Sequence, residues 1–328
     1  MSNESVTNFS NLSRRQFVGN MVAAASTLPL AGLANTLGAG QVANAEPMIC
    51  IFSKHLQWLS VPELVGTVKD LGFKGVDLTV RKGGHVEAAQ VKTDLPKTVE
   101  LFKKAGVEVP MMVTDIVDPE HPDTKTILET AGQLGIKYYR TGYLKYDPKI
   151  SVSKNLDIYK IKIRKLAEMN EKYKIHGAYQ NHAGTNVGGA VWDLWELLRD
   201  VDPQWMGCQY DIKHATAEGG SSWVNGLDVL QPHIRCMDIK DFIWEKKDGK
   251  WQNVNVPLGE GMVDFKTYFN LLAKHGMSGP FSLHLEYPLG GADKGSKQLS
   301  IPPKEVLAAV TRDFETLKKM IKENYSAG

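Results

Sequence analysis

The sequence predicts an α/β protein that folds as a single (β/α)8 TIM barrel after an N-terminal signal segment, and three observations support this. Short apolar runs rich in β-forming residues alternate with longer amphipathic runs eight times. Several of the amphipathic runs are closed by glycine, which is common just past the end of a helix. When residues 1–45 are set aside from the 328, the remaining 283 suit one barrel of this type.

The eight strands are expected in the apolar runs that the amphipathic segments separate. Segments such as "VPELVGTVKDLGF", "LPKTVELFKKAG" and "VDFKTYFNLLAKHG" have apolar residues three and four positions apart, as in helices that cover a sheet. An open doubly wound sheet is the alternative, but no G-x-G-x-x-G motif opens a helix after the first strand. A polar, glycine-rich loop is expected at residues 290–298. In chain order, the predicted strands are Met48–Phe52, Gly75–Val80, Glu108–Thr114, Tyr138–Gly142, His176–Asn181, Met206–Asp211, Ile234–Lys240 and Phe281–Glu286.

The N-terminus is typical of an export signal. Residues 13–17, "SRRQF", contain a twin-arginine pair, and a mildly apolar run broken by proline and glycine follows them. Residues 43–45, Ala-Asn-Ala, match the small-x-small pattern of a cleavage site, so the barrel domain is expected at residues 46–328. We therefore expect export by the twin-arginine route, a periplasmic location, and no stable membrane insertion after the signal is removed.

Composition narrows the class of partner. The formal net charge is +2, and it falls to +1 without Glu4, Arg14 and Arg15 of the signal. A nearly neutral chain has no electrostatic footprint for nucleic acid, so a small-molecule partner is expected. The oligomeric state, including a homo-oligomer, is left open.

The three cysteines are sparse, and each lies in an apolar run that is predicted as strand. Buried free thiols are favoured for Cys50, Cys208 and Cys236, and a bridge between the last two is left open.

Polar residues collect where the predicted strands end. Because the carboxyl ends of barrel strands meet at one rim, these side chains predict an active site there. Carboxylates together with imidazoles suit a divalent ion, and a hydrogen-bonded network without a metal is the alternative. From the first strand to the eighth, these residues are Lys54 and His55; Thr79, Arg81 and His85; Thr114 and Asp115; Arg140; Gln180, Asn181 and His182; Asp211 and His214; Asp238, Lys240 and Asp241; and His284 and Glu286.

Six segments at this rim resemble the xylose-isomerase-like TIM barrels, the family of sugar isomerases and sugar phosphate isomerase/epimerases. They are "GVDLTVRKGGHV", "QNHAG", "YDIKHA", "IKDFIW", "PLGEGMVDF" and "GPFSLHLEY", and the resemblance covers essentially the whole chain after the signal. The signal itself is similar to that of the exported branch. In the epimerases of the family, a divalent metal is held by a glutamate, an aspartate, a histidine and a glutamate after strands five to eight.

Matched by motif, these ligands fall on Gln180, Asp211, Asp238 and Glu286. The resemblance therefore implies a divalent ion (Mn, Mg, Zn or Co) at four positions, two of which depart from the pattern. An amide oxygen at Gln180 can still bind a metal, but it cannot take up a proton near neutral pH.

The departures bear directly on mechanism, because the two glutamates of the epimerases also exchange the substrate proton. Glu286 is then the predicted general base, with Lys240 or the metal stabilising an enediolate oxygen. A one-base isomerisation or a β-elimination needs only this, and His182 acting as a second base would permit epimerisation. Arg81, His85, Arg140, His214 and Glu260 are candidates for holding the substrate.

The aromatic residues near the strand ends fall into two groups, those expected in loops and those expected on a helix. Trp58, Trp223, Trp244 and Tyr143 are expected in loops, where they could stack on sugar faces. Trp192 and Trp195 have helical spacing and are expected to pack on the barrel.

The leading hypothesis is an exported, metal-dependent enzyme that removes a proton next to a sugar carbonyl. An isomerase or epimerase comes first, and a lyase or hydratase acting on a keto-sugar or glycoside comes second. A non-catalytic sugar-binding barrel is a third possibility, motivated by the two departures. A phosphodiesterase of the endonuclease IV type is disfavoured, because the chain lacks the basic charge that its substrate requires.

Overall fold

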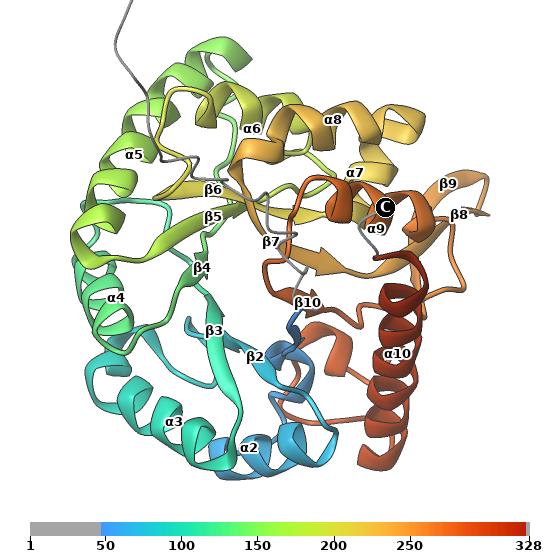
Figure 1. Cartoon of the computed structure of the whole chain (residues 1–328). Helices are drawn as coiled ribbons and strands as arrows, with labels where there is room; N and C mark the ends of the chain where they lie inside the picture. Colours follow the sequence, from blue (N-terminus) through green and yellow to red (C-terminus); the bar gives the residue numbers. More distant parts are fainter. Residues whose placement is uncertain (1–46, 326–328) are drawn as a thin grey trace, which may run out of the picture. The chain divides into compact units, whose positions relative to one another are not determined.

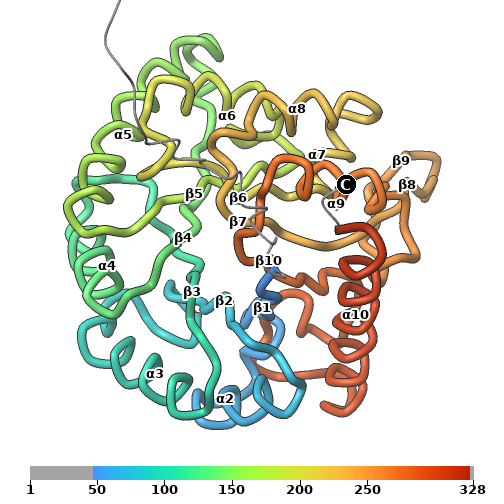
Figure 2. The backbone as a smooth tube through the Cα atoms, viewed as in Figure 1, coloured from blue at the N-terminus to red at the C-terminus, as the bar shows by residue number. Residues whose placement is uncertain are grey.

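The computed structural model describes residues 47–325, and the predicted signal and its cleavage site lie outside them. Eight parallel strands close into a barrel in the order β1-β10-β7-β6-β5-β4-β3-β2, with helices around the outside (Figure 1). Figure 2 shows β1 beside β10, where Cys50 is in register with Ser282. The predicted TIM barrel is thereby confirmed.

All eight barrel strands fall inside the predicted runs. Six of the eight end one to three residues before the predicted end. The strands are β1 (Ile49–Phe52), β2 (Gly75–Thr79), β3 (Glu108–Val113), β4 (Tyr138–Arg140), β5 (His176–Gln180), β6 (Met206–Asp211), β7 (Ile234–Ile239) and β10 (Phe281–Leu283).

Local signals explain where the helices begin and end. Helix α2 starts after Ser60, whose backbone N–H donates to the Glu63 carboxylate at 2.8 Å. Helix α3 ends at Gly106, which has a φ of 77°. The α-helices are α2 (Val61–Asp70), α3 (Val91–Ala105), α4 (Pro122–Gln133), α5 (Val152–Tyr173), α6 (Val191–Leu198), α7 (Ile212–Gly219), α8 (Trp223–Leu230), α9 (Phe265–Lys274) and α10 (Pro303–Asn324). Short 3₁₀ turns are η1 (Ser53–Leu56), η2 (Ala88–Gln90), η3 (Gly220–Ser222), η4 (Gln231–His233) and η5 (Ala292–Lys294).

A β-hairpin that the sequence analysis missed follows the seventh barrel strand. Strands β8 (Asp241–Lys247) and β9 (Lys250–Val256) pair antiparallel through a two-residue turn (Figure 1). Asp248 and Gly249 in this turn have φ of 51° and 77°, and positive φ at both central residues is what a tight hairpin needs. The "DG" pair was the signal that could have found it.

The barrel interior changes from apolar to polar along its axis. Cys50, Met111, Ala178 and Cys236 form an apolar cluster. Farther along the strands, buried Asp77, Gln209, Asp238 and Ser282 make the interior polar. All three cysteines are free and buried, which confirms the favoured prediction and leaves the Cys208–Cys236 bridge unformed.

Three of the tryptophan assignments were wrong. Trp244, which was expected in a loop, lies within strand β8. Trp223 lies in α8 and is only 6% exposed, because it packs in the core rather than in a loop. Trp192 on α6 is 58% exposed, whereas Trp195 packs against the core as predicted. In α6 the buried residues are Val191, Leu194, Leu197 and Leu198, so Trp192 lies outside the buried face of this helix. In residues 47–325, none of the helices has the length and apolar character of a membrane span.

Candidate active site

The structure brings the four residues of the predicted metal set together at the carboxyl ends of the strands. Gln180 and Asp211 are the last residues of β5 and β6, Asp238 lies near the end of β7, and Glu286 follows β10. The first three are buried, and the side chain of Glu286 is 20% exposed. Glu286 is therefore the member of this set that faces outward.

Gln180 is held by four hydrogen bonds that fix which end of its amide faces the carboxylates. Its Oε1 accepts from Nη1 of Arg140 at 2.8 Å and from the Tyr143 hydroxyl. Its Nε2 donates to Asp211 at 2.8 Å and to Asp238 at 2.6 Å. Because arginine can only donate, the oxygen must face Arg140 and the NH₂ group must face the two aspartates. Tyr143 thus holds Gln180, a role the sequence analysis did not foresee.

Lys240 lies between two carboxylates that were both predicted as metal ligands. Its Nζ is 3.0 Å from Oδ2 of Asp211 and 2.9 Å from Oε2 of Glu286, and its side chain is 3% exposed. Burial alone would lower the pKa of Lys240, but the charges of Asp211 and Glu286 raise it above its usual value. Lys240 is a permanent ammonium ion at the centre of the rim.

A second lysine completes the surroundings of Glu286. Nζ of Lys54, in η1, is 2.8 Å from Oε1 of Glu286. Burial would raise the pKa of Glu286, yet the ammonium groups of Lys240 and Lys54 hold it well below its usual value. Glu286 is therefore an ionised carboxylate with a cation against each oxygen.

In this arrangement the four-residue set does not fit a metal ion. Gln180 presents N–H groups to Asp211 and Asp238, and a metal needs an electron pair there. The ammonium of Lys240 already neutralises the facing oxygens of Asp211 and Glu286. Side-chain donors of the chain itself thus fill the positions that a cation would need.

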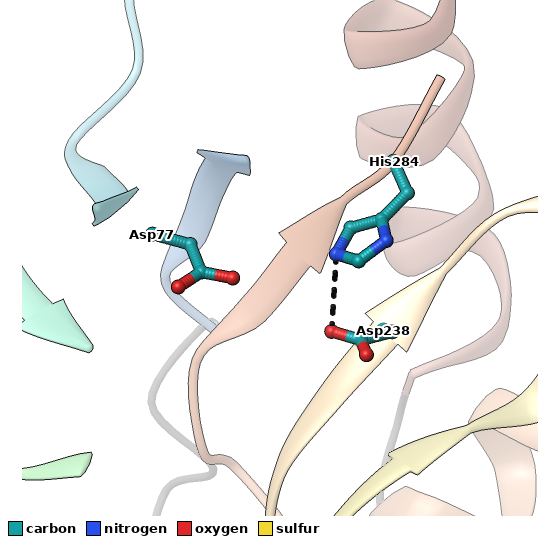
Figure 3. A group of neighbouring side chains, drawn as sticks. All are labelled: Asp77, Asp238 and His284. Atoms are coloured by element: carbon teal, nitrogen blue, oxygen red, sulfur yellow. Dashed lines mark ion pairs between the residues drawn. The ribbon is translucent and has the colours of Figure 1, made fainter. Parts of the chain in front are cut away.

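A different group of three side chains does have the geometry of a metal site. Asp77, Asp238 and His284 each offer one ligand atom, and these atoms lie within 4.8 Å of one another. Figure 3 shows them coming from β2, β7 and the segment after β10, with Nε2 of His284 3.3 Å from Oδ1 of Asp238. Asp77 was not predicted, although a charged residue inside the apolar run "GVDLTV" was a signal for it.

These three residues supply the donor types that a divalent ion takes, although Oδ1 of Asp238 also accepts from Nε2 of Gln209 at 2.6 Å. Oδ2 of Asp77 accepts from Ser282 at 2.7 Å, while its buried Oδ1 has no hydrogen-bond partner within the described chain. Burial, with the charge of Asp238 added, raises the pKa of Asp77 to about 7. Burial raises the pKa of Asp238 to about 6 and lowers that of His284 well below its usual value. A neutral imidazole and two carboxylates form a common donor set for Zn²⁺ or Mn²⁺.

Two predicted histidines lie against each other at the rim, with their ring planes tilted by 35°. The rings of His182 and His214 have centroids 3.8 Å apart. Nδ1 of His182 lies 3.0 Å from the backbone oxygen of Ala183, so it carries the proton and leaves Nε2 with a free electron pair. Burial lowers the pKa of His182. Neither nitrogen of His214 has a hydrogen-bond partner in residues 47–325, and its Nε2 lies 3.7 Å from Asp211.

The five predicted substrate-holding residues are not equally placed. Arg140 and His214 lie at the rim, and Arg81 lies beside it, with its guanidinium 5.9 Å from the Phe52 ring. Both ring nitrogens of His85 are already engaged, by Thr79 and by the backbone oxygen of Leu56, each at 3.2 Å.

Glu260 is the exposed member of these five residues. It is exposed in the loop after β9, and its charge acts on Arg312 of α10. The "PLGEG" segment positions this loop through Asp241, whose carboxylate accepts from the backbone of Gly259 and Gly261 at 3.1 and 2.9 Å.

Lys213, which directly precedes His214, also went unrecognised in the sequence. Its Nζ lies 5.5 Å from the centre of the Phe242 ring, and burial lowers its pKa to about 8. The rim therefore holds a third lysine, and this one lacks the paired carboxylates that surround Lys240.

A cavity of about 640 Å³ opens between the hairpin and the loop after β10, and it reaches Glu286. The predicted glycine-rich loop supplies one wall, and β9 supplies the other. The lining residues are Gln252, Asn253, Val254, Asn255, Glu286, Pro288, Leu289, Gly290, Gly291, Asp293 and Lys294.

Comparison with known proteins agrees with this architecture. Residues 65–306 match the family model described as the xylose isomerase-like TIM barrel. Inosose dehydratase of Bacillus licheniformis is 30% identical over 128 residues, which make up 35% of this chain and 41% of that protein. This chain thus matches less than half of that relative's length.

Solved structures at low identity share the fold. The IOLI protein with a bound zinc atom superposes with a TM-score of 0.66 at 16% identity, covering 85% of this chain and 100% of that one. A D-tagatose 3-epimerase-like protein superposes with a TM-score of 0.62 at 17% identity, covering 84% of this chain and 97% of that one. A probable 3-DHS dehydratase from Bacillus anthracis superposes with a TM-score of 0.61 at 15% identity, covering 82% of this chain and 98% of that one. By the family match over most of its length, the chain belongs to the xylose isomerase-like TIM barrel family.

Proposed function

We propose that this protein is an enzyme that acts on a carbohydrate by removing the proton next to a carbonyl group. The observation that carries the proposal is Glu286. Glu286 is one of the residues that line the 640 Å³ cavity, and its ionised carboxylate has the ammonium groups of Lys54 and Lys240 at 2.8 and 2.9 Å. A base beside fixed positive charge is what enolisation needs, because negative charge develops on the carbonyl oxygen as the proton leaves.

Each group has a definite part in this step. A carboxylate oxygen of Glu286 takes the proton from the carbon next to the carbonyl, and that C–H electron pair moves to form the enediolate. Lys240 or Lys54 donates a hydrogen bond to the enediolate oxygen. Arg140 and Tyr143 hold Gln180, and Gln180 in turn orients Asp211 and Asp238 below the site.

The first candidate activity is isomerisation. Glu286 returns its proton to the former carbonyl carbon, while the proton of the neighbouring hydroxyl passes to the former carbonyl oxygen. The carbon-to-carbon transfer requires a single base, and the rim supplies one. Epimerisation needs a second group on the other face of the carbon. Gln180 cannot serve there, whereas the free Nε2 of His182 can.

The second candidate is dehydration, a lyase activity. It is supported by the likeness to inosose dehydratase and by the same single base. The enediolate can expel the hydroxyl group of the next carbon, and protonated Glu286 returns its proton to that group to form water.

Incubating the purified protein with keto-sugars in D₂O separates these activities. Isomerisation gives a product that has lost no atoms apart from the exchange of hydrogen for deuterium, while dehydration gives a product that has lost one water. If the protein binds one of these sugars but catalyses neither deuterium exchange nor dehydration, a non-catalytic sugar-binding protein is favoured instead.

We also propose that a divalent ion is held by Asp77, Asp238 and His284 and not by the four-residue set. The unpartnered Oδ1 of Asp77 and the two buried carboxylates support this location. The chemistry that an ion supplies there is neutralisation of these carboxylates beneath the rim.

Metal binding is expected to require Asp77 and not Asp211. Elemental analysis after incubation with Mn²⁺, Zn²⁺, Co²⁺ or Mg²⁺ should find about one ion per chain in the parent and in Asp211→Asn, and none in Asp77→Asn. Loss from Asp211→Asn with retention in Asp77→Asn would return the ion to the four-residue set. No ion in any of the three proteins would make the Asp-Asp-His group a purely polar cluster.

Export by the twin-arginine route to the periplasm is a further proposal, supported by "SRRQF" and residues 43–45. Replacing both Arg14 and Arg15 by lysine is expected to leave the protein in the cytoplasmic fraction, because the route reads the arginine pair as an address. The parent should appear in the periplasm with Glu46 as its first residue by N-terminal sequencing. A parent that keeps its first 45 residues would contradict the proposal.

A further inference from the structure

One face of the β8–β9 hairpin carries tryptophan and asparagine side chains in a row. In the strand register, Asn255 is opposite Phe242, Asn253 is opposite Trp244, and Trp251 is opposite Lys246. Directly opposed residues share a face, and so do alternate residues along each strand. Two asparagines and two tryptophans therefore follow one another from the base of the hairpin toward its tip.

The base of this row is joined to the active site. Nδ2 of Asn255 donates to the backbone oxygen of Glu286 at 3.2 Å. Asn253, Asn255 and Glu286 all line the 640 Å³ cavity. A molecule that places its reacting carbon at Glu286 would extend along this row.

The two asparagines each have an acceptor that is not used within residues 47–325. The bond from Asn255 Nδ2 to a carbonyl oxygen fixes the orientation of its amide, so its Oδ1 is the free end. Oδ1 of Asn253 is also shielded from solvent without a partner. A buried acceptor left without a donor is destabilising, and a hydroxyl group of a ligand would satisfy it.

The two tryptophans extend the row beyond the cavity. Trp244 is 42% exposed and lies against Phe242, with ring centroids 6.2 Å apart, and Trp251 is 66% exposed. An indole offers a large, flat apolar surface with few rotatable bonds, so it loses little conformational entropy when a ligand packs on it. Indoles and neutral amides together suit a ligand that combines C–H faces with hydroxyl donors.

We propose that the row Asn255, Asn253, Trp244 and Trp251 binds a second sugar unit, so that the substrate is a glycoside or an oligosaccharide and not a free monosaccharide. The inference rests on the proposed function for one point, that the reacting unit lies at Glu286. The hairpin then holds the unit that does not react.

Equilibrium binding tests this without turnover. Isothermal titration of the Glu286→Gln variant, with cellobiose, maltose, trehalose and glucose as probes, is expected to show at least one disaccharide binding about tenfold more tightly than glucose. Adding Trp244→Ala or Trp251→Ala to this variant should lower its affinity for that disaccharide by about fivefold or more and leave its affinity for glucose unchanged. Trp192→Ala, which removes an indole that is 58% exposed on α6, is the matched control and should change neither.

The other outcomes overturn the inference. It fails if no disaccharide binds more tightly than glucose, or if the two hairpin variants bind the disaccharide as the parent does. It also fails if Trp251→Ala converts a dimer into a monomer by light scattering without affecting sugar binding, because the row would then be a subunit contact. Full activity of Glu286→Gln would remove the proposed base but would not alter these affinities, so the two proposals can fail separately.

Discussion

Glu286→Gln is expected to lower the rate of solvent-deuterium exchange into the substrate by about 10²–10⁴-fold while the protein stays folded. The amide cannot take up the proton, but it keeps nearly the same shape and can still accept a hydrogen bond from a lysine. The measurement is deuterium incorporation by NMR, together with a thermal melt to confirm the fold.

Glu260→Gln is the matched control for this prediction. It makes the same chemical change at an exposed glutamate in the loop after β9, and its exchange rate should equal that of the parent. A fully active Glu286→Gln variant would contradict the assignment of the base and would make His182 the next candidate. Equal losses in both variants would show that Glu260 reaches the substrate after all.

Lys240→Met is expected to abolish exchange and to lower the free energy of unfolding by about 3–5 kcal/mol. The substitution removes the ammonium that lies 3.0 Å from Asp211 and 2.9 Å from Glu286, so that facing carboxylates remain without their common counter-charge. Urea denaturation measures the stability, and the D₂O assay measures the activity.

Two further variants control for the Lys240 prediction. Lys318→Met breaks an exposed pair with Glu315 on α10, and an exposed pair contributes only about 0–1 kcal/mol. Combining Lys240→Met with Asp211→Asn removes one of the unpaired charges and should recover part of the lost stability without restoring activity. If Lys240→Met is as stable as Lys318→Met, the ammonium does not neutralise the rim.

Features that depend on local sequence were predicted well. Each barrel strand falls within a predicted apolar run, because a strand buried on both sides must be apolar along a short stretch. The rim residues followed, since parallel strands all end on the same side of a barrel. The hairpin was missed because its "KDGK" turn lies among exposed polar residues. Only the base of β8, at Asp241 and Phe242, is buried, so no regular alternation marks the two strands.

The hydrogen-bond partners of the rim residues could not be predicted from the sequence, and Gln180 shows why. Its motif position suggested a metal ligand, but the orientation of its amide depends on Arg140, 40 positions earlier, and on Asp238, 58 positions later. Residue type alone cannot say which end of an amide faces a carboxylate, because the two ends differ only in the partners they meet.

By itself, the sequence determined the barrel and the set of side chains at its rim. It also identified the family, because hydrophobic period, strand ends and short motifs are all written along the chain. Only the tertiary structure decided that Lys240 lies between Asp211 and Glu286, that Asp77 meets Asp238 and His284, and that Lys54 reaches Glu286 across 232 positions. The physical reason is that charge, burial and hydrogen bonding act through space, and closing the barrel brings the first strand against the last.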